Sequence, residues 1–263
     1  MCQLLGMNCN TPTDILFSFE GFHRRGGLTD HHADGWGIAF FEGKGCRIFL
    51  DDKPSVESPV AHLVRNYPIK SQNVIAHIRK ATQGEVNLAN THPFMREMWG
   101  QYWIFAHNGD LKTFAPAAGC HFNPVGSTDS ERAFCYLLEK LRSKWCTPPQ
   151  LDALFAEINL LATEIRQHGV FNFMLSNGEV MFAHCASHLH YIIRQAPFNK
   201  AHLVDDDVTV DFSTVTTPYD RVAVVATQPL TDNESWTPLA SGQLILFRDG
   251  APLMTSAVTH PEA

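Results

Sequence analysis

Residues 1–6 read Met-Cys-Gln-Leu-Leu-Gly, so a cysteine directly follows the initiator methionine and opens a short apolar run. Aminopeptidases remove an initiator methionine when the next side chain is small. The expected mature chain, residues 2–263, therefore begins with a thiol beside its own free α-amine. An α-amine has an unperturbed pKa of about 8 and a thiol of about 8.5, so the amine can accept the thiol proton near neutral pH. This pattern predicts a nucleophile at Cys2 that carries its own base. The alternative is a structural cysteine buried in a first strand.

The composition narrows the class of protein. Of the 263 residues, 44% are hydrophobic and 18% are charged, which is typical of a soluble globular protein. The net charge of −7, without a cluster of Lys and Arg, argues against a nucleic-acid partner. No apolar run reaches the length of a membrane span and no signal peptide is visible, so we expect no membrane partner and a cytoplasmic location. The seven cysteines are scattered without a CxxC pair, which favours reduced thiols over disulfides or a zinc site.

Apolar spacing predicts strands at both ends of the chain and long helices between them. Helices are expected from the Thr11–Asp14 start signature, over residues 55–65, from the Thr128–Glu131 capping box and over residues 151–167. A first short strand is expected before Thr11, and further strands are expected over residues 38–41, 46–50, 72–78, 101–106, 170–175, 180–183, 189–194, 208–212, 221–227 and 244–247. No repeat, linker or GxGxxG fingerprint is present. We therefore expect one α+β domain of antiparallel sheets covered by helices, and not an alternating parallel fold.

Two polar segments invite a closer look. His31, His32 and Asp34 could suggest a metal site, but adjacent histidines rarely share one ion and no third cluster completes a site. We expect no metal there. Asp205-Asp206-Asp207 is expected to be a solvated turn.

Hydrolysis of an amide by an N-terminal cysteine needs donors for the tetrahedral oxyanion and groups that hold the substrate. Arg79, expected at a strand end, suits the α-carboxylate of a glutamine-like substrate, and Asp129 suits its ammonium. Asp129 has a second explanation, because an acid in a first helical turn complements the helix dipole. Asn108-Gly109 could be a hairpin turn or could provide an oxyanion hole. Sequence spacing alone does not bring these residues to Cys2.

Five elements occur in one order that resembles the class II glutamine amidotransferases, the family with an N-terminal cysteine nucleophile. They are Cys2, the H-x-R-x-A-T-x-G segment His77–Gly84, the Asn-x-His-Pro segment Asn90–Pro93, His107-Asn108-Gly109, and the T-D-[ST]-E segment Thr128–Glu131. The chain looks most similar to the stand-alone bacterial YafJ-type members. That likeness extends to the residues that follow Cys2, to Asp34-Gly35-Trp36-Gly37 and to Thr227-Gln228-Pro229-Leu230.

The resemblance implies a four-layer αββα sandwich of two antiparallel sheets, the N-terminal-nucleophile hydrolase fold. It implies Cys2 as nucleophile, with the oxyanion hole formed by Asn108 and the backbone N–H of Gly109. The same resemblance assigns the substrate α-carboxylate to Arg79 with the help of Thr82, the substrate ammonium to Asp129, and the ordering of a loop to His92. It requires no metal and no organic cofactor. Lys80 and Gln83 depart from the residues of the aminosugar-forming branch, which affects the details of the pocket.

Three functions remain open from the sequence. The first is a glutaminase that attacks the γ-carboxamide of glutamine with Cys2, releases ammonia and hydrolyses the thioester. Because the chain ends after a glutaminase-sized region, this reading expects any ammonia-accepting synthase to be a separate protein. The second is a free-standing amidohydrolase of another γ-glutamyl amide or peptide. The third is a binding or regulatory protein that keeps the fold without turnover.

Overall fold

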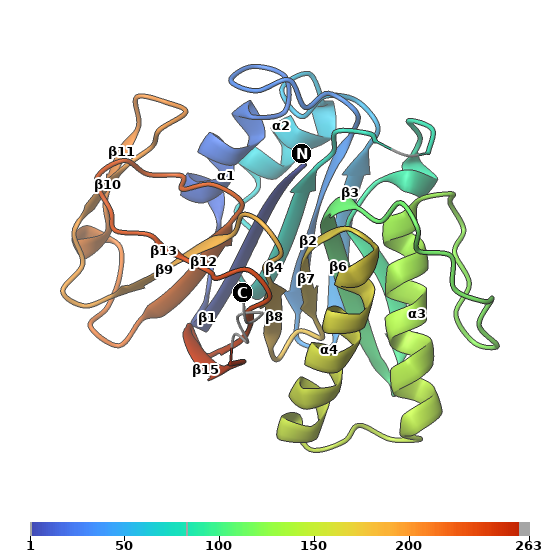
Figure 1. Cartoon of the computed structure of the whole chain (residues 1–263). Coiled ribbons are helices and arrows are strands. Elements are labelled where there is room, and N and C mark those ends of the chain that lie inside the picture. Colours follow the sequence, from blue (N-terminus) through green and yellow to red (C-terminus); the bar gives the residue numbers. More distant parts are fainter. Residues whose placement is uncertain (1, 83, 258–263) are drawn as a thin grey trace, which may run out of the picture.

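The computed structural model describes residues 2–82 and 84–257, and two large antiparallel sheets form its centre (Figure 1). In the seven-stranded sheet the order is β13-β9-β12-β1-β4-β2-β3. Its strands are β1 (Gln3–Thr13), β2 (Trp36–Glu42), β3 (Gly45–Asp51), β4 (Ser71–Ile78), β9 (His190–Gln195), β12 (Arg221–Ala226) and β13 (Thr237–Pro238).

The six-stranded sheet has the order β15-β14-β8-β7-β6-β5. Its strands are β5 (Phe94–Met98), β6 (Gln101–Asp110), β7 (Val170–Ser176), β8 (Met181–His184), β14 (Leu244–Arg248) and β15 (Ala251–Thr255). A small separate pair joins β10 (Lys200–His202) to β11 (Thr209–Asp211).

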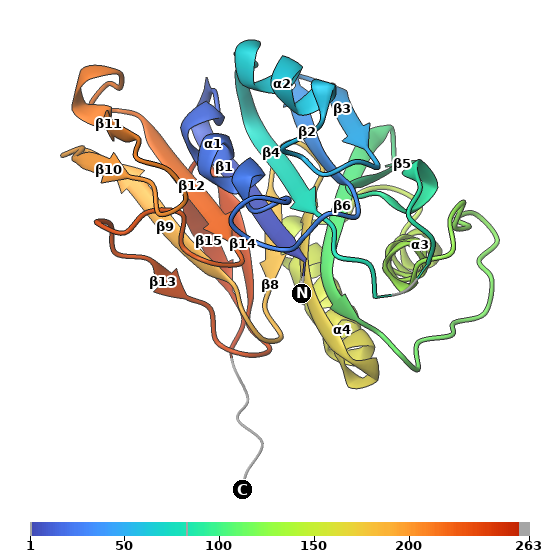
Figure 2. The ribbon, with the colours of Figure 1, turned by 90° about the horizontal axis from the view of Figure 1, so that it is seen from above.

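Helices cover the outer face of each large sheet, as Figure 2 shows from above. The seven-stranded sheet carries α1 (Leu16–Arg24) and α2 (Pro59–Asn66), and the six-stranded sheet carries α3 (Asp129–Lys144) and α4 (Leu151–Ile165). Three short 3-10 helices are η1 (Leu88–Asn90), η2 (Arg166–His168) and η3 (Phe212–Thr214). In the part of the chain that the structure describes, no helix has both the length and the apolar character needed to span a membrane.

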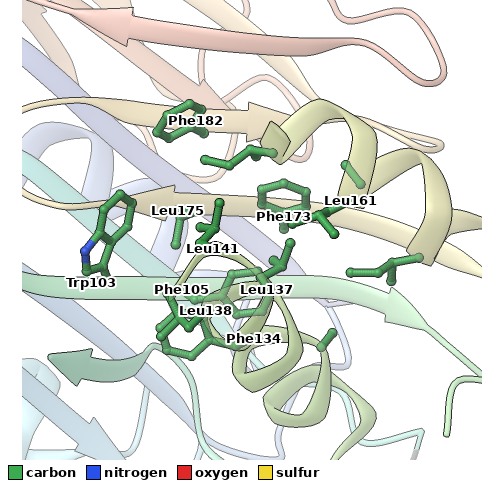
Figure 3. Close-up of a cluster of buried hydrophobic side chains, with 14 of the residues drawn as sticks. Trp103, Phe105, Phe134, Leu137, Leu138, Leu141, Leu161, Phe173, Leu175 and Phe182 are labelled. Atoms are coloured by element: carbon green, nitrogen blue, oxygen red, sulfur yellow. The ribbon is translucent and has the colours of Figure 1, made fainter. Parts of the chain in front are cut away.

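The alternation of side chains along the strands separates three apolar layers. In β1, Leu5 packs toward α1 and α2, whereas Leu4 packs between the two sheets. In β6, Phe105 packs against α3 and α4, whereas Ile104 lies between the sheets. Figure 3 shows the layer under α3 and α4, where the ring of Phe105 stacks on that of Phe134 with centroids 5.0 Å apart. Helix, sheet, sheet and helix therefore follow one another, and the prediction of a four-layer αββα sandwich is confirmed.

Gly6 lies in β1 at a close contact with side chains of the other sheet. A Cβ atom at this position would lie 2.6 Å from Sδ of Met174 and 2.8 Å from Sδ of Met181. Both methionines are fully buried in the layer between the sheets. A side chain at residue 6 would therefore push the sheets apart.

The expected helix start at Thr11 is wrong, because β1 continues to Thr13 and α1 begins only at Leu16. Thr13 pairs with Ser71 of β4 after an irregularity in the ladder, so pairing with the neighbouring strand overrides the local capping signal. Asp14 still caps locally, since its carboxylate accepts the N–H of Leu16 at 3.1 Å.

The possible hairpin turn at Asn108-Gly109 is also wrong, because both residues lie inside β6, opposite Asn172 and Phe171 of β7. Sequence patterns missed β5, β10, β13 and β15. The expected solvated turn at residues 205–207 is corrected in part, since Asp205 forms a buried ion pair with Arg25 at 2.8 Å. The seven cysteines are free thiols, as expected.

Candidate active site

Cys2 lies directly before β1, at the end of the strand where β1 pairs with the last residues of β4. Its Sγ atom accepts a hydrogen bond from the backbone N–H of Lys80 at 3.2 Å and lies 3.3 Å from the backbone oxygen of the same residue. The residue is 9% exposed. Burial raises the pKa of the Cys2 thiol above its ordinary value of 9.0, and the hydrogen bond from Lys80 opposes this effect. The expected removal of Met1 lies outside the described residues.

Arg79 continues the inner face of β4, two residues after His77, and is almost fully buried. Its guanidinium donates to the backbone oxygen of Glu85 at 3.0 Å and to that of Gly84 at 3.4 Å. Burial lowers the pKa of Arg79, whereas the nearby Cys2, Asp34 and Asp129 raise it. The charge of Arg79 also acts on the Cys2 thiol, so the two side chains share one electrostatic environment.

Asn108 lies on the face of β6 that points toward the other sheet, two residues after Ala106. Its Nδ2 atom donates to Oγ1 of Thr227 at 3.3 Å, and the same oxygen accepts the N–H of Leu4 at 2.9 Å. Thr227 therefore links the beginning of β1 to the end of β6 across the two sheets. Gly109 has no space for a side chain, because a Cβ atom there would meet the backbone oxygen of Val170.

Asp129 is the first residue of α3 and is almost fully buried. Its carboxylate accepts the N–H of Leu111 at 2.7 Å and that of Ser130 at 2.9 Å. The helix therefore presents this carboxylate next to the end of β6. Its negative charge acts on both Cys2 and Arg79.

Two of the predicted site residues stand apart from this group. Thr82 is exposed, and among the described residues no hydrogen bond joins it to the others. His92 is buried and packs its ring on His77, with centroids 4.2 Å apart, and on Phe94 at 4.4 Å. Burial holds the pKa of His92 well below 6.5, so the ring is neutral. The departure predicted at Gln83 lies outside the described residues.

A pocket of about 160 Å³ opens beside Cys2. Its other lining residues are Gln3, Asp30, His32, Lys80, His188, Thr227 and Gln228. Of these residues, only Lys80 was connected with the pocket by the sequence. Thr227-Gln228 served only as part of the resemblance, and its position follows from the pairing of Leu5 with Ala226, which local patterns do not reveal.

The histidine-rich segment is arranged differently from a metal site. Nδ1 of His32 lies 2.9 Å from Oδ2 of Asp30, and the carboxylate of Asp34 accepts the backbone N–H of Ala81 at 2.8 Å. Within residues 2–82 and 84–257, no group of three or more His, Cys, Asp or Glu side chains is arranged to hold a metal ion.

Comparisons with known proteins agree on one family. The family described as "Glutamine amidotransferases class-II" matches residues 1–263. The chain is 56% identical over 263 residues to the "Putative glutamine amidotransferase" of Haemophilus influenzae, covering 100% of this chain and 90% of that protein. It is also 56% identical over 248 residues to the "Putative glutamine amidotransferase YafJ" of Escherichia coli, covering 94% and 97%.

A solved structure gives the same result. The "predicted glutamine amidotransferase" of Pseudomonas aeruginosa superimposes with a TM-score of 0.78 at 47% identity, covering 96% of this chain and all of that one.

Proposed function

This chain belongs to the class II glutamine amidotransferases, and from that membership we propose that it hydrolyses the γ-carboxamide of glutamine through a thioester on Cys2 and releases ammonia. The observation that carries the proposal is the grouping around Cys2. A buried thiol lies in the field of a buried arginine and a buried aspartate, which come from three separate parts of the chain. An arginine and a carboxylate are the complements of the two charged ends of an amino acid.

The proposed nucleophile needs a base. Because burial raises its pKa, the Cys2 thiol is protonated at neutral pH before it reacts. We assign the base to the α-amine that removal of Met1 would free on Cys2 itself. A retained methionine would convert this nitrogen into a peptide nitrogen and abolish the base.

We assign the remaining roles as follows. Arg79 binds the α-carboxylate, Asp129 binds the ammonium, and Thr82 shapes the carboxylate end of the pocket. Asn108 and the N–H of Gly109 stabilise the oxyanion, and removal of one such donor typically lowers the rate by about 100- to 1000-fold. His92 orders its loop through packing, a role supported by its buried ring in tilted contact with His77 and Phe94.

The proposed reaction needs no metal or organic cofactor, since thiol, amine and hydrogen-bond donors supply the chemistry. We propose that residues 2–263 act as one catalytic domain, that the protein works in the cytoplasm without nucleic-acid or membrane partners, and that any synthase accepting the ammonia is a separate chain.

One observation favours a second candidate function. The pocket beside Cys2 measures about 160 Å³, whereas a molecule the size of water or ammonia takes about 30 Å³. The space suits a leaving group larger than ammonia. The alternative reaction is therefore hydrolysis of a γ-glutamyl amide whose amine part occupies this pocket.

A comparison of wild type and Cys2→Ala tests the proposed chemistry. Purified wild-type protein should release ammonia from glutamine, and Cys2→Ala should not. Mass spectrometry of the quenched reaction should show a γ-glutamyl adduct on a chain that begins at Cys2. Amine release from larger γ-glutamyl amides at a higher kcat/KM than ammonia release from glutamine would favour the second candidate.

Equal release by both proteins from every γ-glutamyl compound would contradict catalysis by Cys2. If neither protein releases an amine while the wild type binds glutamine, the chain is a binding protein that keeps the fold without turnover.

A further inference from the structure

The segment that precedes α3 forms one wall of a pocket of about 500 Å³. This segment runs beside the helix in both views (Figures 1 and 2). The lining includes residues 116–120 of the segment and, from the helix, Arg132, Tyr136 and Lys140. It shares no described residue with the lining of the pocket beside Cys2. Its volume lies within the range of roughly 300–1,000 Å³ that is usual for sites of small molecules.

Glu139 fixes the segment to the helix. Its carboxylate accepts the backbone N–H of His121 at 2.9 Å and that of Phe122 at 3.1 Å, and it lies 3.0 Å from Nδ1 of His121. Gly119 approaches the same carboxylate closely, since a Cβ atom there would lie 2.6 Å from Oε2. The pocket therefore has two walls that are tied together without a ligand. The negative charge of Glu139 is already engaged by these donors.

The rest of the lining combines apolar surface with two cations. Pro116, Ala117 and the ring of Tyr136 contribute apolar surface. Arg132 is half-buried, its Nε atom is buried, and its guanidinium forms no hydrogen bond or ion pair with the described residues. The ammonium of Lys140 lies 5.1 Å from the centre of the Tyr136 ring, and no carboxylate of the described chain pairs with it. The pocket therefore has positive charge that the protein itself leaves uncompensated.

The arrangement of these groups indicates the chemistry of a ligand. Arg132, Tyr136 and Lys140 are four residues apart, so they lie along one face of α3. A guanidinium pairs well with a carboxylate, and an aromatic ring packs against the apolar body of a ligand. We propose that this pocket binds a small organic anion with an aromatic body and a carboxylate that pairs with Arg132. This inference goes beyond the proposed function, because neither the ligand nor the pocket takes part in amide hydrolysis.

Two probes of nearly equal shape test the charge requirement. The carboxylate of 2-naphthoate is an anion, whereas 2-naphthamide is neutral. Calorimetry should show binding of 2-naphthoate to the full chain, and a Kd for 2-naphthamide that is higher by about tenfold or more. Absence of 2-naphthoate binding would overturn the proposal, and so would equal affinity for the two probes.

Cys120 reports whether the probe occupies this pocket. It lines the pocket and has an exposed side chain, whereas the exposed Cys146 lies outside the lining. At about ten times its Kd, 2-naphthoate should slow alkylation of Cys120 by iodoacetamide about tenfold, because only about a tenth of the pockets remain empty. Alkylation of Cys146 in the same sample should keep its rate. Mass spectrometry of the two peptides measures both rates, and equal slowing or no slowing at Cys120 would contradict the site.

Arg132→Met removes the guanidinium and keeps a long apolar side chain. We expect it to raise the Kd for 2-naphthoate by about tenfold or more and the Kd for 2-naphthamide by less than about twofold. Lys140→Met, at an exposed position, should raise the Kd for 2-naphthoate by about twofold to fivefold. Unchanged binding of 2-naphthoate in both variants would show that its anionic group is not recognised here.

Arg142→Met is the matched control, because Arg142 lies on the same helix but outside the pocket lining. It makes the same change in charge and should leave the Kd for 2-naphthoate unaltered. A loss equal to that of Arg132→Met would reduce the effect to net charge and overturn the proposal. Cys2→Ala should bind 2-naphthoate as the wild type does. The binding test therefore stands or falls separately from the proposed hydrolysis of glutamine.

Discussion

At the scale of single residues, the proposed nucleophile Cys2 combines a buried position with one hydrogen bond from the backbone N–H of Lys80. We predict that alkylation of Cys2 by a small neutral reagent accelerates continuously from pH 7 to beyond pH 9, because burial raises the pKa of its thiol above 9.0. Mass spectrometry of the N-terminal peptide measures this rate. The exposed Cys120 and Cys146 provide internal controls in the same sample. A rate that levels off below pH 7 would show a stabilised thiolate and would contradict the need for a base.

The residues of the site differ in how far the sequence could predict them. Arg79 and Asp129 could be proposed from the sequence because each stands at the end of a recognisable element and carries a charge that would complement one end of an amino acid. His32 was visible only as part of a possible metal site, and Thr227 had no chemical signal at all. Their places depend on which strands pair, and that pairing is a property of the sheet and not of the neighbouring residues.

At the scale of elements, the N-cap of α3 lies next to Asp129, the proposed partner of the substrate ammonium. Oγ1 of Thr128 accepts the N–H of Glu131 at 3.2 Å, and the next residue is Asp129. We predict that Thr128→Ala lowers the free energy of unfolding by about 1 kcal/mol, as loss of an N-cap typically does. It should also raise KM for glutamine, because the first turn no longer holds Asp129 in place. Urea unfolding and steady-state kinetics measure the two effects.

Ser58 gives a matched comparison, since its side chain caps α2 in the same way, accepting the N–H of Ala61 at 3.2 Å. Ser58→Ala should cost similar stability without a change in KM for glutamine. A KM that is unchanged in Thr128→Ala despite the loss of stability would show that the N–H groups of Leu111 and Ser130 hold Asp129 without the cap.

Local signals predicted helices and their ends well where neighbouring residues in the sequence determine the conformation. The capping residue Thr128 and the apolar stripe behind it identified α3, and Gly169, with a φ of 150°, ends the segment after α4 as expected. The same signals failed where pairing with a neighbouring strand determines the conformation of the segment. Thr11 looked like a helix start but extends β1, and Asn108-Gly109 looked like a turn but continues β6, because strand pairing overrides local propensity.

At the scale of the whole molecule, Gly6 lies at a close contact between the two sheets. We predict that Gly6→Ala lowers the free energy of unfolding by about 1–3 kcal/mol, since its Cβ would overlap two fully buried thioether sulfurs. Chemical denaturation measures the change. Gly45→Ala is the control, because its Cβ would meet only the backbone oxygen of Glu42 at 3.4 Å, and we expect a change within about 0.5 kcal/mol. Equal effects of the two variants would contradict close contact between the sheets.

The order of layers was predictable because alternation along each strand tells which side chains face a core. Leu4 and Leu5 illustrate this, since these two residues are adjacent in the sequence but pack in different apolar layers. The link from Asn108 through Thr227 to the beginning of β1 was not predictable in the same way. It depends on how one sheet is placed over the other. The two hydrogen bonds to Thr227 show this placement, and the periodicity of the sequence does not predict it.

The rate at which the two methionines that face Gly6 are oxidised reports how often the protein interior becomes accessible to reagents. Peroxide converts a thioether to a sulfoxide only where the reagent can reach the sulfur. Met174 and Met181 are fully buried between the sheets, whereas Met95 and Met254 are partly exposed. The outer pair therefore reports ordinary access, and slow oxidation of the inner pair counts the rare events in which the two sheets separate. During storage under oxidising conditions, sulfoxide would accumulate on Met174 and Met181 as the sheets separate. Mass spectrometry of the peptide that contains both residues would measure this accumulation.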